Sequence, residues 1–340
     1  MSFRNIAIIG SGAMGTALAI NLSKKSAVSL LFRSAQDADE IRESRINKRY
    51  LPEASLPSEV HISADRAAAL EVADLVLIAS PVSAFAEVLK SVAGLRREVP
   101  IIWSCKGLCP LSGEPLSVLA EKMLGSKACF GVFSGPSFAA SLAANEPTAV
   151  VVATNRKHHT VLKIASGLSN ESLRVYANSD LIGVQICGAI KNVYAIAAGV
   201  IDGCGWRENT RAAMITRAVA EAKCYLEAHD SKRSTLMGLS GFGDIYLTCG
   251  SRSSRNYQVG MALAAGKTLA EALSSIGHVA EGTNTARLIL KRAKVLGLDM
   301  PLVQAVNDVL DGSKTPHECV AALMTREIRH EKSVSRKNAR

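Results

Sequence analysis

The sequence predicts an α/β protein, with a doubly wound, mostly parallel sheet in its first half and an all-α domain in its second half. Three observations predict this class. Short runs of Val, Ile and Leu alternate with helix-like segments over the first half of the 340 residues. This strand signal stops near Ser179, and long helical segments follow. Hydrophobic residues make up 48% of the chain and charged residues 21%, which indicates a globular protein rather than a disordered one.

The strands and helices of the first half can be assigned from their apolar patterns. Continuous apolar runs bounded by polar turns are typical of strands that helices cover on both faces. The expected strands cover residues 6–9, 28–32, 60–63, 75–79, 101–103, 130–133, 149–153 and 173–175. The helices expected between them include residues 13–24, 36–47, 66–71, 82–92 and 116–124. The repeated order of strand and helix indicates a Rossmann-type sheet.

The second half carries helical signals and almost no strand signal. Helices are expected at residues 181–201, 210–229, 269–275, 283–296 and 302–310. The first of these is long enough to cross a membrane, but Gln185, Lys191 and Asn192 lie near its middle, where a charge is costly in lipid. We therefore expect a buried helix and no membrane insertion. The predicted division is a first domain at residues 1–178, a second at 179–325 and a basic, flexible tail at 326–340.

The net charge of +10 does not form one basic stripe. Residues 1–178 carry 19 Lys and Arg against 15 Asp and Glu, residues 179–325 carry 15 against 13, and residues 326–340 carry 6 against 2. The three segments therefore contribute +4, +2 and +4. The tail is short and has no aromatic residue between its charges, which favours a solvated tail over a nucleic-acid-binding arm.

Cysteine usage indicates a reduced environment. None of the eight cysteines is paired at the two-residue spacing of a zinc knuckle or a redox motif. The first apolar run, residues 6–9, is too short for the core of a signal peptide. We therefore expect a cytoplasmic protein without a metal ion.

A glycine-rich turn follows the first expected strand and opens the first expected helix. It reads Gly10-Ser11-Gly12-Ala13-Met14-Gly15. In this context Gly10 allows a tight turn, Gly12 lets the backbone approach a pyrophosphate, and Gly15 lets helix and strand pack closely. The backbone N–H groups of Ala13 and Met14 would add an anion site at the helix start. The turn therefore predicts a dinucleotide cofactor.

The end of the second strand bears on the choice of cofactor. An acidic residue there would bind the adenosine ribose and favour NAD, but the strand ends in Arg33 and the nearest acid is Asp37, four residues on. A cation suits the 2′-phosphate of NADP. NADP(H) is therefore the expected cofactor and NAD(H) the alternative.

The second half adds motifs that identify a family. They are Gln185 to Gly199 around Lys191-Asn192, Gly238 to Asp244, Ser254-Arg255-Asn256 and Val279-Ala-Glu281-Gly282, together with Lys106-Gly107 and Ser134 to Ala139 upstream. In sequence and spacing they resemble NAD(P)-dependent glycerol-3-phosphate dehydrogenase of the bacterial type, over about residues 4 to 325. The resemblance implies hydride transfer between a nicotinamide and C2 of dihydroxyacetone phosphate, giving sn-glycerol 3-phosphate for glycerophospholipid synthesis.

The resemblance also implies roles for individual residues. Lys191, the one charge within an apolar helical stretch, is the expected catalytic acid/base. The residues expected to bind substrate are Lys106, Gly135, Ser137, Lys191, Asp244, Ser254, Arg255 and Asn256. The residues expected to bind cofactor are Gly10, Gly12, Ala13, Met14, Gly15, Arg33, Lys106, Ala139, Arg255, Val279 and Glu281. Residues 1–178 would then bind the NAD(P) cofactor, and residues 179–325 would bind and convert the substrate.

Some readings stay open at this stage. Asp244 could also cap a helix that begins at Ile245, instead of or beside its substrate role, and the partner of Asn192 is not evident from the helix pattern. A related dehydrogenase for a hydroxy acid, or a non-catalytic dinucleotide sensor, would share the architecture, although a sensor would leave Lys191 unexplained. The expected partner is a small phosphorylated substrate and not nucleic acid, and the sequence allows a homodimer.

Overall fold

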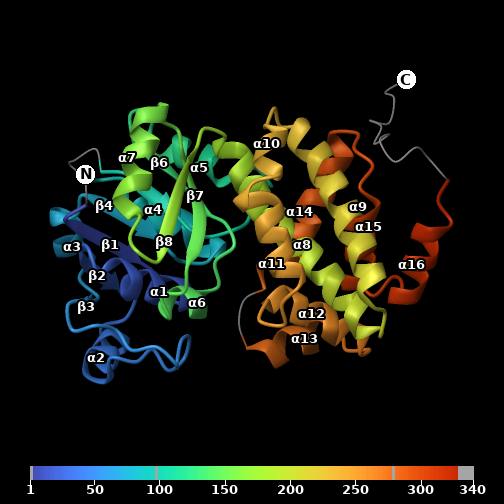
Figure 1. Cartoon of the computed structure of the whole chain (residues 1–340), viewed down its shortest axis with the longest axis horizontal. Coiled ribbons are helices and arrows are strands. Elements are labelled where there is room, and N and C mark those ends of the chain that lie inside the picture. Colours follow the sequence, from blue (N-terminus) through green and yellow to red (C-terminus); the bar gives the residue numbers. More distant parts are fainter. Residues whose placement is uncertain (1–2, 96–98, 278–279, 328–340) are drawn as a thin grey trace. The chain divides into compact units, whose positions relative to one another are not determined.

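The structure is a computed structural model, and it describes residues 3–95, 99–277 and 280–327. The chain forms two compact units (Figure 1). The N-terminal unit comprises residues 1–105 and 116–184, and the helical unit comprises residues 106–115 and 185–340. Lys106 thus belongs with the helical unit, although it lies three residues beyond Ile101–Trp103, a strand of the other unit. The boundaries predicted from sequence, at 178 and 325, stay predictions.

Within the described residues, one eight-stranded sheet forms the centre of the N-terminal unit. Its strands lie in the order β3-β2-β1-β4-β5-β6-β7-β8. Its strands are β1 (Asn5–Ile9), β2 (Ala27–Leu31), β3 (His61–Ser63), β4 (Leu75–Ile78), β5 (Ile101–Trp103), β6 (Phe130–Ser134), β7 (Thr148–Thr154) and β8 (Leu173–Asn178). Neighbours are parallel except β6 and β7, which are antiparallel. The predicted doubly wound, mostly parallel sheet is confirmed. The strand reversal at β7 follows a connection whose one helix spans five residues, too short to cross back over the sheet.

Helices cover this sheet. They are α1 (Ala13–Leu22), α2 (Ala35–Ser44), α3 (Arg66–Val72), α4 (Phe85–Val92), α5 (Leu116–Leu124), α6 (Ala139–Ala143) and α7 (His158–Leu168), with a short 3-10 turn η1 (Val82–Ala84) before α4. The helix expected at 36–47 ends earlier, because Arg45 adopts a left-handed conformation with φ 56° and closes α2. The core is mostly aliphatic, in line with the 4% of aromatic residues in the chain: the β-strand residues Ile6, Ile8 and Leu30 are at most 1% exposed.

Within the described residues of the second half, all the regular secondary structure after β8 is helical. Its helices are α8 (Leu181–Gly203), α9 (Glu208–Glu227), α10 (Arg233–Leu236), a π-helical turn η2 (Leu239–Gly243), α11 (Asp244–Cys249), α12 (Arg255–Ala264), α13 (Leu269–Ile276), α14 (Glu281–Val295), α15 (Pro301–Leu310) and α16 (Pro316–Met324). The sequence reasoning did not predict α12 and α16. Both carry start signals: Ser254 caps α12, and Thr315 with Glu318 forms a capping box before α16.

Helix α8 is the central element of the helical unit. Within the described residues it is the one helix long and apolar enough to cross a membrane, and its most apolar stretch is entirely buried inside the fold. A Cβ atom on Gly199 would lie 2.0 Å from the Tyr257 carbonyl oxygen of α12, so the two helix backbones touch. The prediction that this segment is a buried helix is confirmed. The contact also fixes α12, which begins with Arg255, against the helix that carries Lys191.

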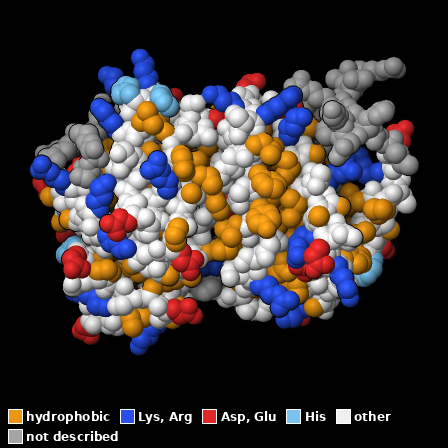
Figure 2. Space-filling model, viewed as in Figure 1, with side chains coloured by type: hydrophobic (Ala, Val, Ile, Leu, Met, Phe, Trp, Pro, Cys, Tyr) orange, Lys and Arg blue, Asp and Glu red, His pale blue; other side chains and the backbone are white. Residues whose placement is uncertain are grey.

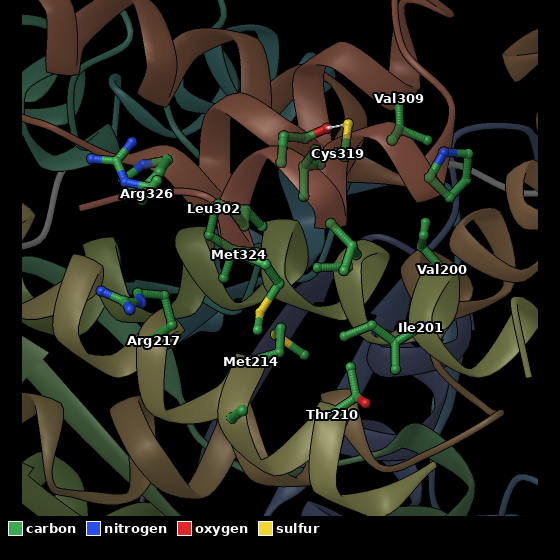
Figure 3. A pocket seen from close by; sticks show the side chains of 18 residues that line it. Val200, Ile201, Thr210, Met214, Arg217, Leu302, Val309, Cys319, Met324 and Arg326 are labelled. Carbon is green, nitrogen blue, oxygen red and sulfur yellow. Dashed lines mark hydrogen bonds between the residues drawn. The ribbon is translucent and has the colours of Figure 1, made fainter. Parts of the chain in front are cut away.

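A largely apolar pocket of about 210 Å³ lies among α8, α9, α15 and α16 (Figure 3). Met214 and Met324 lie near its middle, and Arg217 and Arg326 lie at one end. On the face shown in Figure 2, Lys and Arg side chains are scattered among acidic and neutral ones on each unit. This dispersal agrees with a charge excess that is divided along the chain.

Candidate active site

The glycine-rich turn has the geometry of an anion site. Gly10 follows β1 with φ 115°, a conformation that L side chains rarely adopt. A Cβ on Gly15 would lie 1.8 Å from the Gly10 carbonyl oxygen, so α1 packs directly against the turn. A Cβ on Gly12 would meet nothing within 4 Å, which leaves the approach to the backbone open. Gly12 is the N-cap of α1 and Ala13 and Met14 are its first residues, whose N–H groups have no intrahelical acceptor.

The end of β2 presents a cation and no carboxylate. Arg33 is exposed and lies two residues beyond the last residue of β2. Asp37 lies in the first turn of α2, and its backbone N–H donates to the side chain of Ser34, the N-cap, over 3.3 Å. A carboxylate in a first helical turn stabilises the helix by itself. This accounts for Asp37 without a ribose contact.

In the helical unit, two lysines converge on one carboxylate. Lys191 Nζ donates to Asp244 Oδ1 over 2.7 Å, and Lys106 Nζ donates to Asp244 Oδ2 over 2.7 Å. Asp244 has no exposed surface, and Lys191 is 7% exposed. The sequence placed all three residues in one site, and the fold brings them together from residue 106, α8 and the start of α11. Asp244 is the first residue of α11 and not its cap, which is Gly243, so the alternative role as a helix cap is wrong.

Thr248 completes this cluster, and the sequence reasoning missed it. Lys191 Nζ donates to Thr248 Oγ1 over 2.7 Å, and the hydroxyl is buried. Thr248 follows Asp244 by four residues, one helical turn, so both side chains lie on one face of α11. That spacing was the available signal. With two acceptors at fixed positions, the Lys191 amine is held in one place.

Burial and charge set the protonation of the cluster. The pKa of Lys106 is lowered from 10.5 to about 8, because burial removes water from its ammonium group. The carboxylate of Asp244 opposes this shift and the neighbouring charge of Lys191 adds to it. Two ammonium groups beside one carboxylate leave an excess positive charge. The cluster is therefore suited to receive an anionic substrate, and Lys106 itself loses its proton at about pH 8.

A chain of amides connects the cluster to two further helices. Asn192 Nδ2 donates to the Lys106 carbonyl oxygen over 3.2 Å, and Asn256 Nδ2 donates to Asn192 Oδ1 over 3.0 Å. The Gly282 N–H then donates to Asn256 Oδ1 over 2.9 Å. The partners of Asn192, which the helix pattern left open, are thus Lys106 and Asn256. The chain fixes residue 106, α8, α12 and the start of α14 relative to one another.

The three residues of the Ser254-Arg255-Asn256 element differ in whether their side chains already have partners within the fold. The Ser254 hydroxyl accepts from the Tyr257 N–H over 3.3 Å as the N-cap of α12, and Asn256 is buried in the amide chain. Among the described residues, the guanidinium of Arg255 makes no hydrogen bond or ion pair. Arg255 is therefore the member of the element whose charge is available for a phosphate.

The other predicted site residues lie elsewhere. Gly135 has φ 142° in the N-terminal unit, where the Ser137 hydroxyl donates to its carbonyl oxygen over 3.2 Å, and Ala139 begins α6. Glu281 begins α14 in the helical unit. Val279 lies outside the described residues. Within the described ranges, no group of three or more His, Cys, Asp or Glu side chains could hold a metal ion.

The two units together define a class of enzyme. A doubly wound unit with an open glycine-rich turn, and a helical unit with a buried lysine–carboxylate cluster, are features of two-domain nicotinamide-dependent dehydrogenases. Family models for the N-terminus and the C-terminus of NAD-dependent glycerol-3-phosphate dehydrogenase match residues 5–160 and 180–321. The chain belongs to this family. The resemblance inferred from its sequence motifs is confirmed.

Individual relatives agree over nearly the whole chain. A glycerol-3-phosphate dehydrogenase [NAD(P)+] of Aromatoleum aromaticum is 46% identical over 328 residues, covering 96% of this chain and 99% of the relative. One from Dechloromonas aromatica is 43% identical with the same coverage. A crystal structure of glycerol-3-phosphate dehydrogenase from Coxiella burnetii, 36% identical, superposes with a TM-score of 0.89 and covers 95% of this chain and 99% of that one.

Proposed function

We propose that the chain interconverts dihydroxyacetone phosphate and sn-glycerol 3-phosphate, with Lys191 as the acid/base. The observation that carries this assignment is the buried cluster in which Lys191 and Lys106 share Asp244. Family membership supplies the reaction, and the cluster supplies the groups that it needs: a proton donor, a carboxylate that holds the donor, and positive charge for a phosphorylated substrate.

The proposed step reduces a ketone to a secondary alcohol. The nicotinamide cofactor supplies the hydride to C2 when it is bound. The ammonium group of Lys191 gives a proton to the C2 oxygen as negative charge develops there, and takes it back in the reverse direction. Asp244 and Thr248 hold the amine in place, and Lys106 and Arg255 provide positive charge for the substrate phosphate. Hydride and proton together balance the reduction.

A turnover assay with three candidate substrates tests which of them the chain converts. Dihydroxyacetone phosphate should be reduced rapidly, whereas 6-phosphogluconate and hydroxyisobutyrate should not be oxidised. Lys191→Ala should lower kcat by about 10²–10⁴-fold, the usual contribution of general acid–base catalysis, with cofactor affinity little changed. No turnover of dihydroxyacetone phosphate, or an active Lys191→Ala protein, would overturn the assignment.

The preference for NADP(H) is a separate part of the proposal, with NAD(H) as the alternative. It is supported by the exposed Arg33 beyond the end of β2 and by the role of Asp37 in the first turn of α2. Arg33→Asp should move the ratio of kcat/KM for NADPH and NADH toward NADH. A ratio that does not change would show that Arg33 does not bind the 2′-phosphate.

The cellular setting is proposed on the same basis. We expect a cytoplasmic enzyme whose product enters glycerophospholipid synthesis, and the eight free thiols are compatible with a reduced compartment. The sequence allows a homodimer, and sedimentation equilibrium measures whether the chain forms one. Removal of residues 327–340 should leave activity intact, because no proposed site residue lies there.

A further inference from the structure

Asn47 links a distant segment to the glycine-rich turn. It is 3% exposed, and its Nδ2 donates to the Ser11 carbonyl oxygen and to Thr16 Oγ1, both over 2.8 Å. Thr16 N–H in turn donates to the Gly12 carbonyl oxygen over 3.0 Å. The Asn47 amide therefore binds both the turn and the start of α1. It lies 36 positions from Ser11 and 31 positions from Thr16 in the sequence.

The segment that carries Asn47 is itself firmly held. Arg45 Nη1 donates to the Val60 carbonyl oxygen over 2.8 Å, and Leu56 N–H donates to the Arg45 carbonyl oxygen over 2.7 Å. Leu51 and Leu56 are buried in the aliphatic core of the N-terminal unit. Asn47 is thus presented from a packed segment, and its hydrogen bonds can restrain the turn.

The bond to Ser11 fixes the orientation of one peptide group. In a trans peptide the carbonyl and the N–H point in opposite directions, and no cis peptide occurs in the described chain. When the Ser11 carbonyl points at Asn47, the N–H of Gly12 must point away from it. The open space beside Gly12 is where a cofactor pyrophosphate would approach. A flipped peptide would instead turn a carbonyl oxygen toward that anion.

We propose that Asn47 is a positioning residue for the dinucleotide, which holds the Ser11–Gly12 peptide so that the Gly12 N–H is directed at the pyrophosphate. The inference rests on the proposed placement of the pyrophosphate at the glycine-rich turn. Asn47 acts through the backbone of the turn and is not required to touch the cofactor. The amide is suited to this because its N–H groups donate to two acceptors at once, whereas a carboxylate would repel the Ser11 carbonyl.

The test compares three variants of the full chain. Asn47→Ala removes both hydrogen bonds, and Asn47→Asp keeps the size of the side chain but replaces the donor by an acceptor. Asn21→Ala is the matched control. Asn21 is buried like Asn47, but it lies in α1, and its side chain bonds to Asn145, Ser172 and Asn170, away from the turn. The dissociation constants of NADPH and NADH are measured by quenching of protein fluorescence, beside thermal unfolding and steady-state kinetics.

We expect Asn47→Ala to weaken both cofactors by about tenfold, the effect of one lost hydrogen-bonding group, and Asn47→Asp to weaken them further. At saturating cofactor, kcat and the KM for dihydroxyacetone phosphate should stay within about twofold of the wild-type values. Asn21→Ala should lower the unfolding temperature and leave cofactor affinity unchanged. Thermal unfolding shows which of the two Asn47 variants is folded at the assay temperature, and either folded variant tests the inference.

Two results would overturn the inference: unchanged cofactor affinity in Asn47→Asp, or an equal loss of affinity in Asn21→Ala, which would indicate general destabilisation. The variant Gly12→Val distinguishes a wrong role for Asn47 from a wrong placement of the pyrophosphate at the glycine-rich turn. If Gly12→Val binds NADPH normally, the pyrophosphate does not lie at this turn. If Gly12→Val loses binding while Asn47→Asp retains it, the site stands and the role of Asn47 is wrong.

Discussion

Lys106 and Lys191 hydrogen-bond to opposite oxygens of the same buried carboxylate, each over 2.7 Å. One carboxylate can neutralise only one of the two ammonium groups. The second positive charge is therefore held in a site from which most water is excluded, which is unfavourable until an anion arrives. A phosphorylated substrate supplies that anion, so the cluster is electrostatically suited to bind it.

The pH dependence of catalysis should reveal the loss of the proton from Lys106. In the free protein the pKa of Lys106 is lowered to about 8, chiefly by burial. A bound phosphate favours the protonated lysine, so substrate binding should weaken as pH rises through about 8 and Lys106 loses its proton. We expect kcat/KM for dihydroxyacetone phosphate, measured from pH 6.5 to 9.5 at saturating cofactor, to fall by up to about tenfold per pH unit above that value.

Lys106→Arg is the matched variant for this profile. An arginine stays protonated throughout the range, so the decline near pH 8 should disappear even if the absolute rate is lower. A decline that persists unchanged in Lys106→Arg would show that Lys106 is not the group that titrates.

Thr248 should matter through the Lys191 amine. Thr248→Val keeps the shape of the side chain but removes the acceptor that lies 2.7 Å from Lys191 Nζ. We expect kcat to fall about tenfold, because the Lys191 amine would lose one of the two acceptors that hold it in place. The KM for the cofactor should be unchanged. Thr248→Ser keeps the hydroxyl and should recover most of the rate. If the serine and valine variants are equally slow, the hydroxyl does not position Lys191.

The sequence could predict the sheet and could single out Lys191, because both depend on local patterns. Apolar runs define strands whatever their neighbours, and the motifs around Lys191 and Asp244 are contiguous. The partners of Asn192 could not be predicted, since the amide chain through Asn256 joins residues 64 positions apart and exists only after α8 and α12 pack together. Lys106 follows a strand of the N-terminal unit but groups with the helical unit, a result of tertiary contacts that no local pattern records.

Gly282 should be intolerant of a side chain. A Cβ there would lie 2.6 Å from Asn256 Oδ1 and 2.7 Å from the Asn192 carbonyl oxygen, within the amide chain that holds the site. We expect Gly282→Ala to lower the free energy of unfolding by about 1–3 kcal/mol, the usual cost of overpacking, and to reduce kcat/KM. Urea unfolding and steady-state kinetics measure the two effects.

Gly94→Ala is the control for this substitution, because a Cβ at Gly94 would meet no atom of the described residues within 4 Å. It should leave both stability and activity close to those of the wild type. A Gly282→Ala protein that behaves like Gly94→Ala would show that the amide chain can shift without consequence.

Glu221 gives the helical unit a pH-dependent stability. It lies in α9, is 2% exposed and accepts from the backbone N–H groups of Leu302 and Val303, at the start of α15, over 2.6 and 3.2 Å. Burial raises the pKa of Glu221 from 4.5 to about 8, although the two N–H donors and the charge of Arg217 favour the carboxylate. At neutral pH this side chain is therefore largely protonated in the folded protein and ionised in the unfolded one.

The sign of the effect follows from proton counting. Between pH 4.5 and about 8 the folded state binds the proton that the unfolded state has released, so the contribution of Glu221 to stability is full below pH 4.5 and is lost as pH rises toward 8. Glu221→Gln keeps an oxygen for the α15 N–H groups and cannot ionise. Relative to this variant, the wild-type free energy of unfolding in urea should decline by a few kcal/mol from pH 5 to 8 and then level off. Parallel curves for the two proteins over that range would show that Glu221 is ionised throughout.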